Sequence, residues 1–400
     1  MPRDELIDAL RGFALFGILA VNIQCFVTGL GAPSLGFLDA HSSLADHCTV
    51  LLSALLLEFK FYPLFCFCFG YGFAVQTRRW VARGEPAGPR FGRRMNAMLL
   101  MGMLHGVLLW FGDILARYAI AGYLLRRYTG NGPRRLLDAA KFWFIAALVL
   151  MVFFVAVTAA GSSTEVSADA LASQQSLQAE GVRVFAAYSQ GSYLDATIQR
   201  ANDFVVVTLG FILLVPQIML IFLLGALAAQ LGLLRNPGRH RQFWERMLRL
   251  GLWVGIPVNV VYAMQQWQAS QHPWTTSNSV TTMMAGDLAP ILSVAFIAAF
   301  ALYGGDGLGK RLVQLLAPAG RLALTLYVSQ SVAMALLLNG FGFGLGATSS
   351  PSELFAIATG IYALQIAASH AMQRLGIAGP LELLWRRYTY SSHSKDTQRA

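Results

Sequence analysis

Apolar residues along this chain gather in long runs that are separated by short polar or basic segments. A helix needs about 20 apolar residues to cross the hydrocarbon core of a bilayer, and most of these runs approach or exceed that length. The fourth run is short, so the sequence leaves open whether it crosses fully. The pattern predicts an all-α, polytopic membrane bundle of about ten transmembrane helices, at residues 10–30, 49–76, 95–111, 114–127, 136–160, 203–233, 247–267, 286–304, 319–340 and 352–374.

The composition supports a membrane protein and excludes two other classes. Charged residues make up 12% of the chain and hydrophobic residues 56%, and the mean hydropathy is +0.53. A soluble domain carries roughly 25% charged residues, and a disordered chain is poor in apolar residues. The net charge of +10 fits basic cytoplasmic loops. The sequence shows no external basic stripe, so we expect no nucleic-acid partner.

Charge placement predicts the orientation. If the N-terminus is cytoplasmic, nearly all of the 30 lysines and arginines fall in inner segments. The outer segments then hold only Arg183 and Arg200, while Lys60 and Arg117 fall inside predicted helices. Because cytoplasmic loops of membrane proteins are enriched in Lys and Arg, we expect both termini in the cytoplasm.

The chain is expected to form an N-terminal membrane half (1–233), a C-terminal membrane half (234–390) and a flexible tail (391–400). The external connection 161–202 is the longest segment outside the membrane. Its composition predicts a flexible stretch and then a surface helix, which could act as a lid or as a plain connector. Aromatic residues and arginines in 379–390 predict a helix at the inner interface.

Polar residues at mid-depth are the first candidates for a functional site. Ionisable groups inside a span are costly and usually face the bundle interior. Asn22 and His105 each lie eleven residues beyond an inner arginine, or about 16 Å at about 1.5 Å per residue, so they reach a similar depth. Gln217 and Gln330 also fall near mid-depth. Each of these side chains could instead be a hydrogen-bonding contact between helices, and both interpretations stay open.

A second group of polar residues is predicted in the outer third of the bundle. It contains Glu58, Lys60, Asp113 and Arg117, with Asp287 nearby. Asp113 and Arg117 are four residues apart and could form an ion pair if the turn between them is helical. The group could line a polar cavity that opens to the outside, or it could consist of ion pairs that fix the bundle.

Two further sets of residues bear on ligands. Arg78, Arg79, Arg93 and Arg94 bracket one short inner loop and could hold phosphates, although they also mark topology. The chain has four cysteines, and three of them lie within apolar runs. We therefore expect no disulfide framework, no metal site and no permanently bound cofactor.

Five segments, in order along the chain, resemble the YeiB-like bacterial membrane proteins. They are RDELIDALRGFALFGILAVNI (3–23), FKFYPLFCFCFGYGF (59–73), GMLHGVLLWFGDILARYAIAGYLL (102–125), GRLALTLYVSQS (320–331) and GPLELLWRRYTY (379–390). The Phe-rich second segment is expected to face lipid and to pack, with Gly70 allowing a close helix approach. The C-terminal half looks like the domain of unknown function 418. The resemblance implies a bacterial inner-membrane protein.

This family is similar to a wider group of transmembrane acyltransferases that includes the lysosomal heparan glucosaminide acetyltransferase. Those proteins have an arginine, ten residues and then a polar residue at mid-membrane, and Arg11 and Asn22 have that spacing. The related O-acyltransferases have histidine at the second position, whereas this chain has asparagine. Asn22 cannot act as a base, but it can donate a hydrogen bond to a carbonyl. His105, at the same depth, is then the candidate base.

The resemblance implies transfer of an acyl group from cytoplasmic acyl-CoA, as co-substrate, to an outer acceptor such as a sugar or envelope glycan. Two alternatives stay open, which are a transporter or flippase-like carrier and a non-enzymatic assembly subunit. Besides the lipid bilayer, a homodimer partner is compatible with the sequence. The expected catalytic residues are His105, Asn22 and Asp113; the expected acceptor-binding residues are Lys60, Glu58, Arg117, Gln330 and Gln217; and the expected phosphate-binding residues are Arg78, Arg79, Arg93 and Arg94.

Overall fold

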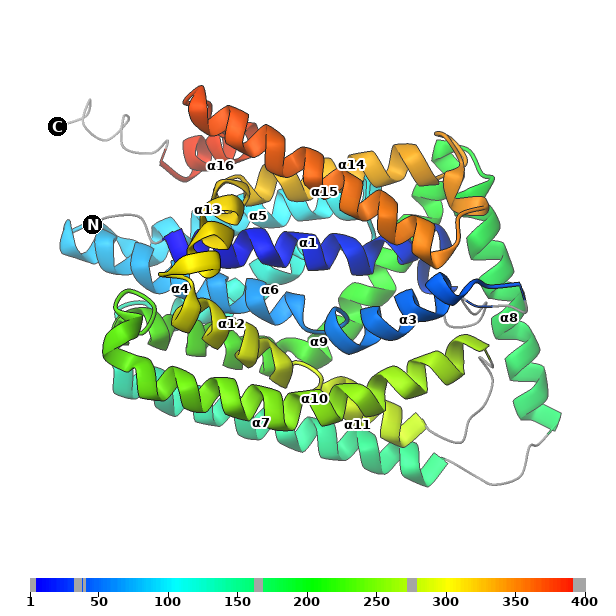
Figure 1. The fold of residues 1–400 in the computed structure, drawn as a ribbon, viewed down its shortest axis with the longest axis horizontal. Coiled ribbons are helices and arrows are strands. Elements are labelled where there is room, and N and C mark those ends of the chain that lie inside the picture. The colour runs from blue at the N-terminus through cyan, green and yellow to red at the C-terminus, as the bar shows by residue number, and fades with distance from the viewer. Residues whose placement is uncertain (1–4, 32–37, 39–40, 162–167, 272–278, 391–400) are drawn as a thin grey trace.

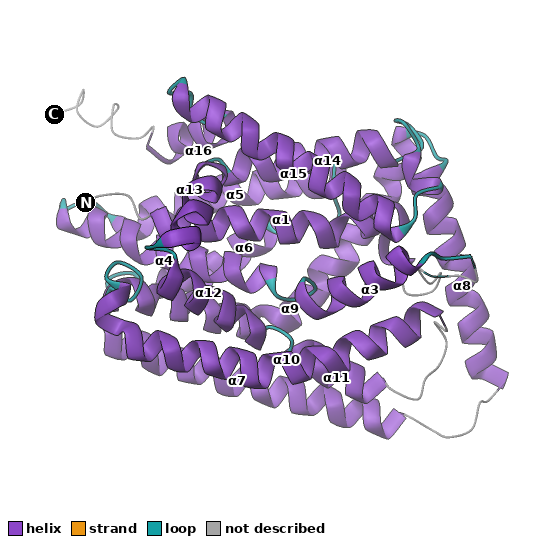
Figure 2. Cartoon of the chain, viewed as in Figure 1, coloured by secondary structure: helices purple, strands orange, loops and turns teal. Residues whose placement is uncertain are grey.

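The structure is a computed structural model that describes residues 5–31, 38, 41–161, 168–271 and 279–390. These residues form helices joined by turns and contain no β-strand (Figure 2), so the predicted all-α fold is confirmed. The predicted tail, 391–400, and residues 162–167 of the external connection lie outside the described residues. The helices are α1 (Glu5–Thr28), η1 (Gly29–Gly31), α3 (Leu44–Leu56), α4 (Phe61–Ala82), α5 (Ala87–Leu108), α6 (Leu115–Leu125), η2 (Arg126–Tyr128), α7 (Pro133–Gly161), α8 (Ala168–Ser189), α9 (Tyr193–Leu231), η3 (Pro237–His240), α10 (Arg241–Gln271), α11 (Ser279–Leu288), α12 (Ile291–Tyr303), α13 (Gly307–Arg321), α14 (Ala323–Leu338), η5 (Leu345–Ala347), α15 (Pro351–Arg374) and α16 (Pro380–Tyr390).

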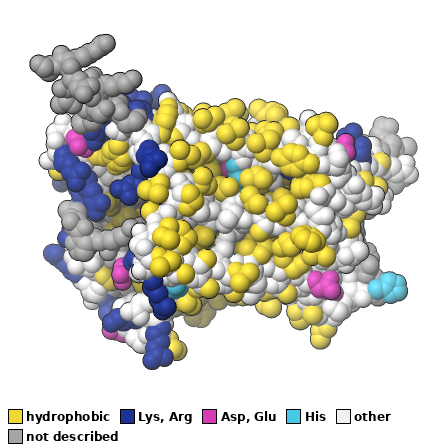
Figure 3. Space-filling view, turned by 90° about the horizontal axis from the view of Figure 1, so that it is seen from above, with side chains coloured by type: hydrophobic (Ala, Val, Ile, Leu, Met, Phe, Trp, Pro, Cys, Tyr) yellow, Lys and Arg dark blue, Asp and Glu magenta, His cyan; other side chains and the backbone are white. Residues whose placement is uncertain are grey.

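Most helices run side by side along the long axis of the molecule (Figure 1). Helix α1 lies inside the bundle and packs against α4, α13, α14 and α15. The beginning of α1 and the whole of α16 lie at one end, which we call the basic end because lysines and arginines gather there (Figure 3). We call the opposite end the loop end. Between the two ends, hydrophobic side chains cover the visible surface, as expected of a protein surrounded by lipid.

Seven helical segments of the described chain are long and apolar enough to cross a bilayer, and α13 with α14 would make an eighth as a pair bent by 79°. The chain is therefore a multi-pass membrane protein. These eight segments coincide with eight of the ten predicted runs, and the other two runs are α5 and α6. Helix α6 has 11 residues, which is about 16 Å and roughly half of a hydrocarbon core. Helices α5 and α6 thus form a hairpin that begins and ends near the basic end.

The Phe-rich segment packs in the core. Phe61, Phe67 and Phe73 are buried, so the expectation that this segment faces lipid is wrong for them. The reason is the close pairing of α4 with α9. A Cβ on Gly70 would overlap with the carbonyl of Phe222, and a Cβ on Gly225 of α9 would overlap with the carbonyl of Phe67. Glycines on both helices let the two backbones come into contact. The close helix approach expected at Gly70 is therefore confirmed.

The connection between α7 and α9 contains a helix that lies across the bundle. Helix α8 runs crosswise to the other helices at the loop end (Figure 1), and it packs against α1, η1 and α9. Near its C-terminal end Val184 and Tyr188 are buried, and the carbonyl of Tyr188 accepts a hydrogen bond of 2.9 Å from the Gly340 N–H. The predicted surface helix is divided in two, because α8 ends at Ser189 and α9 begins at Tyr193. A capping box of Ser192 and Asp195 starts α9.

Helix α16 holds two other helices in place at the basic end. The Glu382 carboxylate accepts hydrogen bonds from the backbone N–H groups of Leu324 (2.8 Å) and Thr325 (3.1 Å), at the start of α14. The Trp385 indole donates to the Arg94 carbonyl of α5 at 3.0 Å, and the Arg94 guanidinium lies 3.5 Å from the centre of the Trp385 ring. The helix predicted for 379–390 is therefore present, and it connects α5 with α14.

The contact between α4 and α9 gives a test of the fold. Replacing Gly70→Ala should lower the free energy of unfolding by about 1–3 kcal/mol, because the new methyl group must push two backbones apart. Thermal unfolding in detergent measures the change. Gly360→Ala, on α15, is the matched control because a Cβ there meets no atom within 4 Å. Equal melting temperatures for the two variants would contradict the close contact.

Candidate functional site

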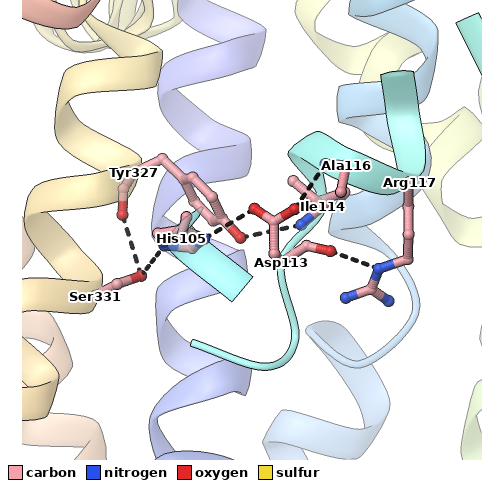
Figure 4. Close-up of polar contacts among 7 residues, drawn as sticks. All are labelled: His105, Asp113, Ile114, Ala116, Arg117, Tyr327 and Ser331. Atoms are coloured by element: carbon pink, nitrogen blue, oxygen red, sulfur yellow. Dashed lines mark hydrogen bonds and ion pairs between the residues drawn. The ribbon is translucent and has the colours of Figure 1, made fainter. Parts of the chain in front are cut away.

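His105 is the centre of a hydrogen-bonded network that joins three parts of the chain (Figure 4). It lies in the last turn of α5. Its Nδ1 is 2.8 Å from Oδ1 of Asp113, in the turn between α5 and α6. Its Nε2 is 2.8 Å from Oγ of Ser331, on α14. The structure thus brings together two predicted site residues, His105 and Asp113, and adds a serine that lies 226 positions from the histidine in the chain.

All three side chains are removed from solvent and lipid. His105 is 4% exposed, Asp113 is 0% exposed and Ser331 is 1% exposed. The network assigns the tautomer of a neutral imidazole, because an ionised Asp113 can only accept and therefore takes the Nδ1 proton. Nε2 is then free to accept the hydroxyl proton of Ser331. The alternative acceptor for this proton is the Tyr327 carbonyl at 3.4 Å, which is a long hydrogen bond.

The start of α6 fixes the carboxylate of Asp113. Oδ2 accepts a hydrogen bond of 2.6 Å from the Ala116 N–H, where the N-terminus of a helix favours a negative charge. Gly102 of α5 makes this close approach feasible, since a Cβ there would overlap with the Ala116 nitrogen. Arg117 donates from Nε to the backbone carbonyl of Asp113. The predicted ion pair between the Asp113 and Arg117 side chains is therefore wrong, because His105 and Ala116 occupy the carboxylate.

Helix α14 contributes two residues that the sequence analysis missed, Tyr327 and Ser331. The Tyr327 ring lies 4.9 Å from the imidazole of His105, and its hydroxyl accepts a hydrogen bond of 3.3 Å from the Ile114 N–H. Their spacing of four places both on one face of a helix, and this could have been the signal. The predicted residue, Gln330, faces elsewhere and donates to Gln365 of α15 at 2.8 Å.

The predicted outer group of charges is divided between two places. Asp113 and Arg117 belong to the His105 network, whereas Glu58 and Lys60 lie at the break between α3 and α4. There Glu58 accepts a hydrogen bond of 2.7 Å from the Tyr262 hydroxyl. Lys60 is fully buried, donates to the Ala54 carbonyl and lies 5.3 Å from the centre of the Tyr262 ring. A single polar cavity lined by all four predicted residues is therefore not what the structure shows.

The other predicted mid-depth residues lie outside the His105 network. Gln217 accepts a hydrogen bond of 2.9 Å from Tyr62 and donates to the Asp287 carbonyl at 3.5 Å. Asn22 is half-buried on α1, and its side chain forms no hydrogen bond with any residue that the structure describes. Its catalytic role stays a prediction.

The four predicted phosphate-binding arginines lie in two different settings. Arg78 and Arg79 are exposed near the end of α4, whereas Arg93 and Arg94 are half-buried on α5. Nε of Arg93 is buried without a hydrogen-bond partner, and Arg94 stacks on α16. Among the described residues, no cluster of three His, Cys, Asp or Glu side chains is placed to hold a metal ion, and the four cysteines form no disulfide.

A double-mutant cycle tests the network. His105→Ala and Ser331→Ala should show a coupling energy of about 0.5–3 kcal/mol, because their side chains share a buried hydrogen bond. The free energy of unfolding in mixed detergent micelles measures it. His105→Ala with Ser329→Ala is the control pair, since Ser329 donates to the Leu326 carbonyl instead. If the coupling energy of the control pair is as large as that of the first pair, Ser331 is not the residue of α14 that contacts His105.

Comparisons with known proteins agree with this architecture. Residues 228–392 match the family described as a protein of unknown function, DUF418. The chain is 29% identical to YxaH of Bacillus subtilis over 98% of this chain and 95% of YxaH. It is 25% identical to YeiB of Escherichia coli over 97% of each chain. A 39.9 kDa protein encoded in the amylase 3' region of Bacillus acidopullulyticus is 26% identical over 97% of this chain and 94% of its own. Residues 228–392 therefore form a DUF418 domain, and the chain resembles the YeiB-like proteins along nearly its whole length.

Proposed function

We propose that this protein is an acyltransferase of the bacterial inner membrane. It would move an acyl group from cytoplasmic acyl-CoA to the hydroxyl of an outer acceptor, such as a sugar or envelope glycan. The observation that carries the proposal is the buried imidazole of His105. The Ser331 hydroxyl lies 2.8 Å from its Nε2, and the Asp113 carboxylate lies 2.8 Å from its Nδ1. An imidazole held in this way can remove a hydroxyl proton while the carboxylate stabilises the imidazolium.

In this proposal the basic end faces the cytoplasm and the bundle has ten crossings, with α5 and α6 as the third and fourth. Arginines gather at that end (Figure 3), as on the cytoplasmic side of membrane proteins. The start of α1 and helix α16 share this end. Because the α5–α6 hairpin returns to the end where it begins, both termini stay on one side whether it counts as two crossings or as none.

The donor would approach along α5. Arg93 and Arg94 lie near the start of this helix, and His105 is eleven residues beyond Arg94, or about 16 Å at about 1.5 Å per residue. Phosphates held at the arginines would leave the thioester arm free to reach His105. Arg78 and Arg79 would add positive charge across the short loop, and Asn22 would donate to the thioester carbonyl.

The predicted acceptor-binding residues have a different role in this proposal. Glu58, Lys60, Arg117, Gln217 and Gln330 each bond to other parts of the chain. We therefore assign them to holding helices in place. The acceptor hydroxyl would come from the loop end, the side on which α5 reaches His105.

A carrier is the second candidate, and the interrupted helices favour it. Helices α13 and α14 are bent by 79° at their junction, and α3 and α4 are separated by a turn in which Phe59 has a φ of 61°. Discontinuous helices often form the substrate sites of transporters. Uptake of a solute into vesicles without thioester consumption would favour this function.

Transfer from acyl-CoA tests the leading proposal. Protein in nanodiscs should release CoA when sugar acceptors are present. His105→Ala should reduce the rate by about 10²–10⁴, because the general base is lost, and Asp113→Asn should reduce it by a similar factor, because the wrong tautomer is favoured. Free thiol measured over time gives the rate, and Ser329→Ala is the control. Full activity in His105→Ala would rule out the proposed base.

Thiol labelling tests the orientation. In a Cys48→Ser background, Gln178→Cys lies on α8 at the loop end and Gly238→Cys lies in η3 at the basic end, and both positions are exposed. A membrane-impermeant maleimide added to spheroplasts should label the first and not the second, and lysis should expose both. The reverse pattern would place the basic end outside.

A further inference from the structure

We propose that Ser331 is the nucleophile of the transfer, so that the acyl group passes through an ester on Ser331 Oγ. This inference rests on the proposed acyltransferase function and deepens it. It assigns a catalytic role to a residue of α14 and divides the reaction into two half-reactions at one atom.

The hydrogen bonds of Ser331 carry the inference. A serine hydroxyl is a weak nucleophile unless an adjacent base removes its proton and a third group orients that base. Oγ of Ser331 is 2.8 Å from Nε2 of His105, and Asp113 binds the opposite ring nitrogen at 2.8 Å. Because these groups are buried, water does not compete for the proton. The arrangement satisfies the geometric requirement for an activated nucleophile.

Among the described residues, the other buried serines have no imidazole partner. Ser293 donates to the Lys60 carbonyl at 2.6 Å and Ser369 donates to the Gln365 carbonyl at 2.7 Å. Ser329, an exposed serine two residues from Ser331, also donates to a carbonyl, that of Leu326 at 2.9 Å. A backbone carbonyl can accept a hydrogen bond but cannot take the proton away. Hydrogen bonds of this kind hold the serine hydroxyl on a backbone oxygen, whereas the contact with His105 supplies a base.

The chemistry balances in two steps. First, Oγ of Ser331 bonds to the thioester carbonyl carbon, its proton moves to Nε2 of His105, and the carbon–sulfur bond breaks as the CoA sulfur takes that proton. Second, an acceptor hydroxyl gives its proton to Nε2 and its oxygen bonds to the same carbon. The ester bond to Oγ then breaks and Ser331 regains the proton. Thioester and alcohol become ester and thiol, and no oxidant or metal is consumed.

A double displacement suits the position of the site. Ser331 lies in the middle of α14, which runs from the basic end to the loop end. CoA can leave toward the basic end before the acceptor arrives from the loop end. Donor and acceptor then never need to occupy the bundle together, so each half-reaction requires access from one side only.

Two probes test the nucleophile. The first is a fluorophosphonate, which bonds to activated serines and needs no knowledge of the natural acyl group. The second is acetyl-CoA with an isotopically labelled acetyl group, supplied without acceptor. Wild-type protein in nanodiscs should carry one label from each probe, and peptide mapping should place it on Ser331. Ser331→Ala should carry none, His105→Ala should be labelled about 10²–10⁴ times more slowly, and Ser329→Ala should match the wild type.

The outcomes separate the inference from the proposed function. If Ser331→Ala consumes acyl-CoA with acceptor at the wild-type rate, transfer is direct and the serine is not the nucleophile, while the acyltransferase function stands. If the fluorophosphonate labels Ser331 but no acyl-CoA is consumed, Ser331 is confirmed as an activated nucleophile and acyl-CoA is ruled out as the donor. Labelling at another residue, or none from either probe in a folded wild type, overturns the inference.

Discussion

Backbone groups that are freed where a helix breaks must find new partners, because lipid offers none. Charged side chains meet this need at three junctions of the bundle. Lys60 binds the Ala54 carbonyl beside the α3–α4 break, Arg117 binds the Asp113 carbonyl between α5 and α6, and Glu382 binds the first N–H groups of α14. At these three junctions, charged side chains therefore close interrupted helices.

The candidate site is a product of the same constraint. Asp113 uses one carboxylate oxygen to hold the start of α6 and the other to hold His105. At the end of α5, the Leu108 carbonyl accepts hydrogen bonds from Arg200 and, at 3.0 Å, from Tyr193. The imidazole is thus positioned by an interruption in the helices, and a continuous helix would leave no carboxylate beside it. Structure and chemistry depend on the same turn.

The sequence contained most of the fold and half of the candidate site. Long apolar runs locate helices because the bilayer demands length, and His105 and Asp113 are conspicuous because ionisable groups are costly in lipid. Ser331 could not be recognised in the same way, because burying a serine hydroxyl in a helix costs little free energy and so does not mark a functional position. The depth of a residue in the membrane also does not determine which way its side chain points around the axis of the bundle. Lys60 and Arg117 were expected to lie together on depth alone, but they face different neighbours.

The contacts of α16 have a consequence for biosynthesis. The N-terminus of α14 is capped by a carboxylate more than 50 positions later in the chain, and the same helix holds Arg94 of α5. Chains are synthesised from the N-terminus, and their early segments begin to fold first. Helices α5 and α14 therefore enter the membrane before the helix that aligns them exists. A nascent chain in which α5 and α14 are already inserted can still be inert, and the later synthesis of α16 completes the alignment of a serine with a histidine made much earlier.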